Sequence, residues 1–364
     1  HGNAFLEHGC GDARPTRPLA KVYQCCARRC TDGRVSIRRC DEQDDEMGKL
    51  SRKTLLFLPA PASCGTIPCG FAGDARRSRD QARKEPDAIM MQDEIQTLRP
   101  DALSPAEIAE KAEKVGEAKA AMPKAKCFAS AMLAGAFIAF GALYFCVFLG
   151  DPSMPFAVQR AVGGLCFCLG LVLVLCCGAE LFTGNVLLVC AKASGRIGWR
   201  SLFGNWLLVW LGNLAGALVA LALVHFANVA AMNGGAVGEA FVSVAAGKVA
   251  PDWTTLFFKG VMCNILVCLA VWIGFSARTV ADKVLGILLP ISAFVACGFE
   301  HCVANMFFLP MGLLLNSMGV GAPDAVTLAG IATNLSAATL GNVAGGVAVG
   351  MAYWFVYRKK DVDR

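Results

Sequence analysis

Charged residues are scarce in this chain. Only 17% of its 364 residues are Asp, Glu, Lys or Arg, whereas 55% are hydrophobic and the mean hydropathy is positive. This balance is typical of multi-pass membrane proteins and argues against a soluble domain. The net charge of +6 gives no case for nucleic-acid binding, because the basic residues mostly flank apolar spans, where they set topology.

Metal-binding cysteine patterns are also missing. Seven of the eighteen cysteines precede residue 100, and none of these seven forms a C-x-x-C pair. Their spacing matches no zinc template, which disfavours a metal site there. The other eleven lie within or beside apolar segments, where cysteine packs as a small hydrophobic residue. We therefore predict neither a metal nor a cofactor.

The first hundred residues lack helical or strand periodicity and mix Arg, Cys, Pro, Gly and acidic residues, which predicts a disordered extension. A helix is predicted to follow, because Ser104 is an N-cap residue, Pro105 suits the first helical position and Glu107 is the third residue after the cap. The predicted parts are an N-terminal extension (1–103), an amphipathic pre-membrane helix (104–126), a six-span transport domain (127–357) and a tail (358–364).

Six apolar segments are each long enough for the about 20 residues that a spanning helix needs. Basic residues cluster before span one, after spans two and four, and in the tail, which places these four regions on the cytoplasmic side. Both termini are therefore predicted to be cytoplasmic, in the plasma membrane or, as the alternative, in an organelle membrane. The predicted spans are 127–149, 156–190, 200–227, 254–275, 284–316 and 325–357.

Two motifs occur twice among these spans. Gly-x-Glu-x-x-x-x-Asn occurs at 178–185 in span two and at 298–305 in span five, and Leu-Gly-Asn occurs at 211–213 in span three and at 340–342 in span six. Spans one to three and spans four to six therefore form two copies of an internal repeat. Because each half crosses the membrane an odd number of times, the second copy is inverted. Inverted repeats place their sites near the bilayer midplane, where helices break.

Each copy of the first motif places a Gly, an ionisable Glu and an Asn in mid-span, where a charge is costly unless it is paired or hydrated. Unwound backbone is tolerated there only if protein encloses it or it lines a water-filled cavity. We expect Glu180 and Glu300 to accept donors that hold the two breaks, and Asn185 and Asn305 to satisfy freed carbonyls. Both carboxylates are interpreted as structural clamps, because a bare carboxylate would harm an anion pathway.

Taken together, the motifs resemble the formate/nitrite transporter family. The matching stretches are CGAELFTGNVLLVCAKASGRIGWRSLFGNWLLVWLGNLAGAL, FFKGVMCNILVCLAVWIGFSA, AFVACGFEHCVANMFFLP and TNLSAATLGNVAGG. The resemblance implies an all-α membrane protein with an aquaporin-like six-helix bundle, an inverted 3+3 repeat, and helices two and five interrupted. It also implies a homopentamer in the lipid bilayer with one pore in each protomer. The implied substrates are formate or nitrite and, in some members, lactate, acetate or hydrosulfide.

The same resemblance assigns roles to residues of the pathway. His301 corresponds to the central histidine, and Thr183 corresponds to the threonine of the loop that interrupts helix two. Lys248 falls where a lysine of the outer vestibule is expected, and Asn342 resembles the pore-side asparagine near the histidine. Without the resemblance, Lys248 is an ordinary loop lysine and the aromatic residues are packing residues. The apolar constriction is assigned to Phe167, Leu171 and Phe294.

His301 also stands out without the resemblance, because only it and His225 are histidines of the membrane region and intramembrane ionisable groups are usually functional. A histidine pKa of about 6.5 is easily shifted by neighbours. We therefore hypothesise that His301 donates a hydrogen bond or a proton to the anion, because a bare anion crosses an apolar collar only at high cost. Both versions predict proton-linked transport that is faster at lower outside pH.

Three other functions fit the sequence less well. A water or neutral-solute channel of aquaporin type shares six spans and two half-helix breaks, but both copies here lack its Asn-Pro-Ala tripeptide. A haem or di-metal enzyme needs several intramembrane ligands, and only two histidines are available, so we predict no catalytic residue and no enzyme. A structural or receptor role leaves the paired polar breaks unexplained.

Overall fold

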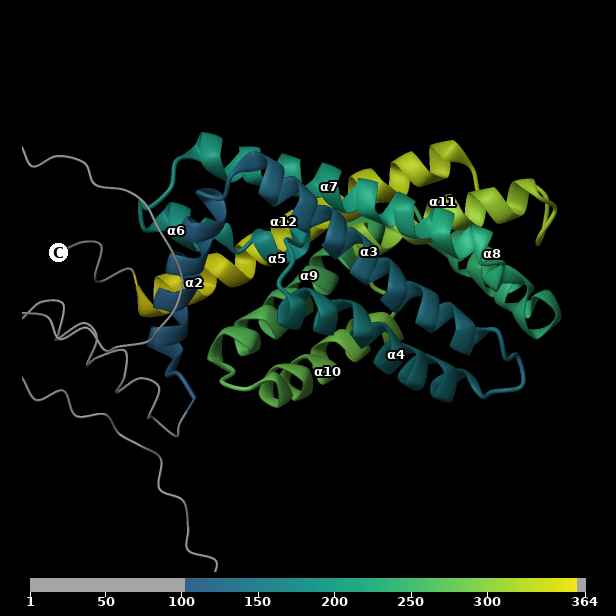
Figure 1. Ribbon diagram of the computed structural model, residues 1–364, viewed down its shortest axis with the longest axis horizontal. Coiled ribbons are helices and arrows are strands. Elements are labelled where there is room, and N and C mark those ends of the chain that lie inside the picture. The colour runs from purple at the N-terminus through teal and green to yellow at the C-terminus, as the bar shows by residue number, and fades with distance from the viewer. Residues whose placement is uncertain (1–101, 359–364) are drawn as a thin grey trace, which may run out of the picture. The chain divides into compact units, whose positions relative to one another are not determined.

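The computed structural model describes residues 102–358, and nearly all of the predicted extension and tail lies outside them. Within this range every regular element is a helix, as predicted for an all-α membrane protein (Figure 1). The elements are α2 (Pro105–Ala120), α3 (Lys124–Leu149), α4 (Phe156–Cys177), α5 (Phe182–Asn185), α6 (Leu188–Ala193), α7 (Trp199–Phe226), the 3-10 helix η1 (Val229–Gly235), α8 (Ala236–Val249), α9 (Trp253–Ser276), α10 (Val280–Ala296), α11 (Cys302–Ser317) and α12 (Leu328–Tyr357).

α2 begins where its capping residues indicate. The Glu107 backbone N–H donates to the Ser104 hydroxyl at 3.4 Å, and the Ser104 N–H donates to the Glu107 carboxylate at 2.8 Å. The helix predicted over 104–126 is nevertheless two helices, because α2 ends at Ala120 and α3 begins at Lys124. Pro123 separates them, since it has no N–H to continue the first helix and its ψ of 132° is extended.

Spans two and five are both interrupted, as the repeated motif predicts. α4 ends at Cys177 and the chain turns through Gly178 at φ 78°, whereas α10 ends at Ala296 and the chain turns through Gly298 at φ 69°. A positive φ favours glycine, so the first residue of each motif allows the helix to stop there. The chain resumes helical structure at Phe182 in α5 and at Cys302 in α11.

The sequence did not predict α8. Residues 236–249 were assigned to the loop after span three, but they form a helix that follows three left-handed residues, Asn233 to Gly235. Together η1 and α8 form one of the six described helical segments that are long and apolar enough to cross a membrane. α8 alone is about 21 Å long at 1.5 Å per residue, which is shorter than the about 30 Å of a bilayer core.

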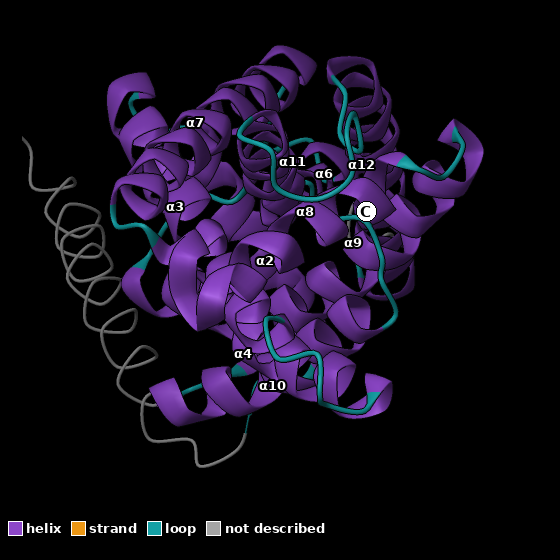
Figure 2. Cartoon of the chain, turned by 90° about the vertical axis from the view of Figure 1, so that its right-hand side faces the viewer, coloured by secondary structure: helices purple, strands orange, loops and turns teal. Residues whose placement is uncertain are grey.

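The two halves pack in corresponding ways. α7 packs along α3 in the first half, and α12 packs along α9 in the second. α2 contacts α6 of the first broken span, and α8 contacts α11 of the second. The halves meet where α4 lies beside α10 (Figures 1 and 2). This correspondence between the two halves is the one that the predicted 3+3 repeat requires.

Glycines allow the closest of these helix contacts. A Cβ on Gly216 of α7 would overlap the Met132 carbonyl oxygen of α3, and a Cβ on Gly345 of α12 would overlap the Val261 carbonyl oxygen of α9. Lipid provides no hydrophobic driving force between membrane helices, so their association depends on such close van der Waals packing. The two glycines occupy corresponding positions of the repeated Leu-Gly-Asn segments.

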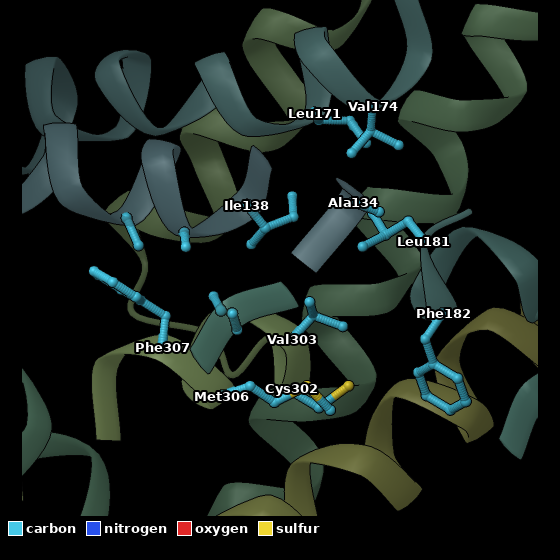
Figure 3. Close-up of a cluster of buried hydrophobic side chains, with 14 of the residues drawn as sticks. Ala134, Ile138, Leu171, Val174, Leu181, Phe182, Cys302, Val303, Met306 and Phe307 are labelled. Carbon is cyan, nitrogen blue, oxygen red and sulfur yellow. The ribbon is translucent and has the colours of Figure 1, made fainter. Parts of the chain in front are cut away.

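A large buried cluster joins the two halves near the breaks. Figure 3 shows Ile138 and Leu171 of the first half together with Val303 and Met306 of the second. Each of these four side chains is at most 2% exposed. The broken segments therefore pack against one shared apolar core, which fixes their positions relative to each other.

The four basic regions that the sequence places on one side of the membrane meet at α2. The carboxylate of Glu113 accepts hydrogen bonds from Ser194 at 2.6 Å and from Arg196 at 3.2 Å, both in the loop after span two. It also accepts a hydrogen bond from Arg358, at the end of α12, at 3.1 Å. The amine of Lys111 donates to the carbonyl of Phe275 at the end of α9, at 2.6 Å, and burial lowers the pKa of this amine. These contacts place all four regions at one end of the bundle.

Alanine substitutions at two glycines of α7 should have opposite effects on the stability of the protein. Alanine favours a helix over glycine by about 0.8–1.0 kcal/mol, and a Cβ at Gly204 meets nothing within 4 Å. Gly204→Ala should therefore be neutral or stabilising. Gly216→Ala should lower the free energy of unfolding by about 1–3 kcal/mol or more, because α3 and α7 must separate. Thermal unfolding of both variants in detergent tests this, and equal melting temperatures would contradict the close packing.

Candidate functional site

The break between α10 and α11 is held by Asn342 of α12. Its side-chain oxygen accepts the Cys302 N–H at 2.9 Å, and its amide nitrogen donates to the carbonyls of Glu300 and Gly260, each at 2.8 Å. Both amide donors and the side-chain oxygen of this buried residue thus bond to backbone groups, two of which the break has freed. Asn342 was predicted to face the pathway near the histidine, and the structure places it fully buried behind the break.

The break after α4 is held by Asn213 of α7 in the same way. Its side-chain oxygen accepts the Phe182 N–H at 2.8 Å, and its amide nitrogen donates to the carbonyls of Glu180 and Ala131 at 2.9 and 2.7 Å. The sequence analysis noted the repeated Leu-Gly-Asn motif but gave Asn213 no role. Its equivalence to Asn342 within that motif was the signal that could have identified it.

Each break also has a buried carboxylate with a lysine counter-ion. The Lys119 amine lies 2.9 Å from the Glu180 carboxylate, and the Lys248 amine lies 3.1 Å from the Glu300 carboxylate. The two glutamates are 5% and 2% exposed, so neither charge is left to solvent. These contacts have the clamp geometry that was predicted for both glutamates. Lys119 was not predicted as a site residue.

Asparagines complete both carboxylate clusters. The Asn185 amide donates to Glu180 at 2.7 Å, and the Asn305 amide donates to Glu300 at 2.7 Å. They were expected to satisfy freed carbonyls, but the structure directs their amides to the carboxylates. The same two amides also donate to a second asparagine of each half, Asn205 at 3.0 Å and Asn334 at 2.7 Å, respectively.

Thr183 and His301 join the two breaks. The Thr183 hydroxyl lies 3.1 Å from Nε2 of His301, and the two residues are 0% and 2% exposed. His301 is also the N-cap of α11, because its Nδ1 accepts the Ala304 backbone N–H at 3.1 Å. An Nδ1 that accepts a hydrogen bond carries no proton, so the neutral ring holds its proton on Nε2 and donates it to Thr183. The sequence predicted both residues, and the structure brings them together.

Two cavities lie near this pair, one lined by His301 and the other by Gly184 and Asn185, which follow Thr183 in the chain. The first, here called the His301 cavity, has a volume of about 350 Å³ and is lined by His301, Lys248 and Arg160 among others. The second, here called the Lys119 cavity, has a volume of about 60 Å³ and is lined by Lys119 and Asn185 among others. The two cavities have no lining residue in common. They are therefore two separate cavities in this structure.

The predicted constriction residues line these two cavities. Phe167 and Phe294 line the His301 cavity, whereas Leu171 lines the Lys119 cavity. The two phenylalanine rings meet edge to face with centroids 5.5 Å apart, and the Phe294 ring stacks on the His301 ring at 5.8 Å. All three constriction side chains are at most 3% exposed. An apolar collar thus lies directly beside the histidine.

Lys248 lines the His301 cavity, as expected of a vestibule lysine, but it is not a loop residue. It lies in the last turn of α8, and its side chain is 15% exposed. Lys119 occupies the last turn of α2 in the same way. Each half of the repeat therefore has a short helix before its first span, and the final lysine of that helix neutralises the glutamate of the break.

The described residues include no cluster of three or more His, Cys, Asp or Glu side chains that could hold a metal ion. The seven cysteines that precede residue 100 lie outside the residues that the structure describes. The eleven later cysteines are all free thiols, and eight of them are buried, among them Cys302 beside His301.

The ion pair at the second break predicts a non-additive effect on stability. Lys248→Met leaves the Glu300 carboxylate buried without its counter-ion, and such a loss costs about 3–5 kcal/mol. The double variant Lys248→Met/Glu300→Gln should recover much of this stability. The matched control is Lys114→Met, which breaks an exposed pair with Glu110 and should cost at most about 0.5 kcal/mol. A double variant as unstable as Lys248→Met in thermal unfolding would contradict the clamp.

Comparisons with known proteins agree with this architecture. The family model described as formate/nitrite transporter matches residues 106–355. The formate channel FocA of Escherichia coli (strain K12) is 39% identical over 277 residues, which cover 72% of this chain and 96% of that protein. The nitrite transporter NirC of Salmonella typhimurium (strain LT2) is 36% identical over 237 residues, which cover 64% of this chain and 83% of that protein.

Solved structures extend the match to three dimensions. A pentameric formate channel with formate bound superimposes with a TM-score of 0.60 at 40% identity, covering 65% of this chain and 98% of that one. An FNT family ion channel gives a TM-score of 0.62 at 32% identity, covering 69% of this chain and 98% of that one. The matched region contains both breaks, both buried carboxylates and the Thr183–His301 contact. The chain belongs to the formate/nitrite transporter family, whose members are multi-pass integral membrane channels and transporters, not enzymes.

Proposed function

We propose that this protein transports small monovalent anions, formate or nitrite first and lactate or acetate as further candidates, by a proton-linked pathway through His301. The single observation that carries the proposal is the Thr183–His301 hydrogen bond, which joins the two helix breaks between two otherwise separate cavities. The relatives named formate channel and nitrite transporter support the substrate class.

The geometry of His301 directs its chemistry to one nitrogen. Nδ1 is held by the Ala304 N–H at the start of α11, so a proton placed on Nδ1 would remove the cap of that helix. The Nε2–H donates to Thr183 in this structure. When Thr183 releases it, the same N–H is available to an anion in the His301 cavity. In this proposal the neutral ring keeps its Nε2–H and donates a hydrogen bond to the anion, and the proton that neutralises the anion comes from water in the His301 cavity.

The collar explains why a proton should accompany the anion. Phe167, Leu171 and Phe294 offer no hydrogen-bond donor, and an ionised carboxylate that leaves water without a partner is strongly disfavoured. Protonation of formate or nitrite from water, while the Nε2–H holds the anion, gives a neutral acid that loses far less hydration free energy on entering this collar. The buried glutamates do not repel the anion, because their lysine counter-ions neutralise them.

We further propose that the protein is a homopentamer with one pathway in each protomer. A solved relative is described as pentameric, and helices α7 and α10 expose large apolar side chains to lipid or to neighbouring copies, including Leu207 at 63% and Leu289 at 77%. Native mass spectrometry should find five copies of the 38.4 kDa chain. The end of the bundle formed at α2 is proposed to face the cytoplasm of the plasma membrane, since it gathers four basic regions.

The main test is uptake of labelled formate, nitrite and lactate into proteoliposomes at outside pH 5 and 7.5. We expect faster uptake at pH 5, because acid supplies the co-transported proton. His301→Phe should lower uptake by at least about tenfold, since a positioned hydrogen-bond donor typically contributes about 100-fold or more. The matched control is His225→Phe, because His225 lies at the end of α7 and lines neither cavity.

Three outcomes would count against this proposal. Unchanged flux in His301→Phe would reduce His301 to a structural cap of α11. Equal uptake at both pH values would remove the proton linkage. Flux of water or glycerol without any anion flux would favour the aquaporin-type alternative.

A further inference from the structure

Two basic side chains line the His301 cavity, and none of the contacts described above gives them a structural role. Arg160 of α4 and Lys259 of α9 line this cavity together with Lys248. Among the described residues that line it, Glu300 is the single carboxylate, and Lys248 already neutralises it. Neither Arg160 nor Lys259 forms an ion pair within the part of the chain that the structure describes. The cavity therefore holds an excess of positive charge.

The repeat shows that the architecture does not require these charges. When Gly178 is matched to Gly298, Arg160 corresponds to Val280. The carbonyl of Lys259 accepts the Glu300 N–H, and in the first half that place is taken by Ser130. Both cations are thus replaced by uncharged residues at the other end of the pathway. The lysines that clamp the breaks, in contrast, are present in both halves.

The Arg160 guanidinium lies at the mouth of the second break with unused hydrogen-bonding capacity. A Cβ at Gly298 would lie 2.9 Å from its Nη2, whereas nothing lies within 4 Å of the equivalent point at Gly178. The Nε of Arg160 is buried without a hydrogen-bond partner, and its guanidinium carbon lies 5.7 Å from the centroid of the Phe156 ring. A buried donor without a partner is costly, so this geometry favours a bound acceptor.

We propose that Arg160 and Lys259 form an anion-recruitment site in the His301 cavity, which binds a small planar oxyanion before it reaches the collar. The site rests on the proposed function and adds a selecting step to it. A guanidinium offers two parallel N–H donors in a fork that fits the two oxygens of a carboxylate or of nitrite. Lys259 contributes a single ammonium charge. The site therefore favours two-oxygen anions over chloride or hydrosulfide, which have only one acceptor atom and cannot form two parallel hydrogen bonds with the fork.

The first test asks whether formate binding depends only on the positive charge of Arg160 or also on the two parallel N–H donors of its guanidinium. Initial uptake of labelled formate is measured in proteoliposomes over a range of concentrations for Arg160→Gln, Arg160→Lys and Lys259→Gln. Arg160→Gln should raise the half-saturation concentration by about tenfold, which corresponds to ~1.4 kcal/mol, with little change in the maximal rate. Arg160→Lys keeps the charge but loses the fork, so it should also bind formate more weakly than the wild type. Lys192→Gln is the control, because Lys192 lines neither cavity.

The second test uses a thiol of the same cavity and does not depend on transport direction. Cys297 is exposed and lines the His301 cavity. Membrane-impermeant methanethiosulfonates of similar size, one with an anionic and one with a cationic head, are added outside, and the loss of flux is followed. The anionic reagent should react faster in the wild type, formate should slow it, and Arg160→Gln should remove both effects. Cys297→Ser identifies the reacting thiol, because this variant should resist both reagents.

The outcomes separate this site from the proposed function. Wild-type protein that transports neither formate nor nitrite would overturn the proposed function and, with it, the recruitment step. Normal wild-type transport with an unchanged half-saturation concentration in Arg160→Gln would overturn the site alone. An Arg160→Lys variant identical to the wild type would also overturn it, because long-range attraction would then explain the effect. If Arg160→Gln unfolds, Arg160→Lys and the formate protection of Cys297 still decide the question.

Discussion

The structure depends on one constraint. Where a helix is interrupted inside a bilayer, the backbone N–H and C=O groups that lose their helical partners must form hydrogen bonds elsewhere in the protein. Asn213 and Asn342 meet this constraint with the same three hydrogen bonds, one accepted from the backbone after the break and two donated to carbonyls. The paired carboxylates, Glu180 with Lys119 and Glu300 with Lys248, bury charge without leaving it uncompensated. Because both breaks are held in this way, they can face each other in the middle of the bundle.

The proposed transport pathway follows from where those breaks meet. Their ends bring Thr183 to His301, and the collar residues Phe167 and Phe294 pack directly beside the histidine. Two separate cavities lie near this contact. This polar donor at the edge of an apolar collar is the basis for our proposal that a small anion passes as its neutral acid. The two cavities differ in their basic residues, because Arg160 and Lys259 line the His301 cavity and not the Lys119 cavity.

Much of this fold is encoded in local patterns of the sequence. The repeated Gly, Glu and Asn in mid-span predicted both interruptions, since glycine permits the turn and a buried carboxylate demands partners. The partners themselves were harder to predict. Lys119 is 61 residues from Glu180 and Lys248 is 52 residues from Glu300, so no common spacing links them. α8 was missed because the Asn-Gly-Gly turn before it favours a loop, and its 14 residues are fewer than a spanning helix needs. Phe167 and Phe294 resemble any other aromatic residue of the spans, and only the family resemblance singled them out.

The central claim is that the anion crosses the collar together with a proton at His301. The most direct measurement is the proton count per formate in proteoliposomes that contain a pH-sensitive dye and a voltage-sensitive dye, with protein-free liposomes as the reference for passive formic acid entry. With an inward formate gradient and equal pH on both sides, the account predicts that the lumen acidifies in step with formate uptake while the membrane potential stays unchanged. Formate uptake that charges the membrane and leaves the lumen pH constant would contradict it.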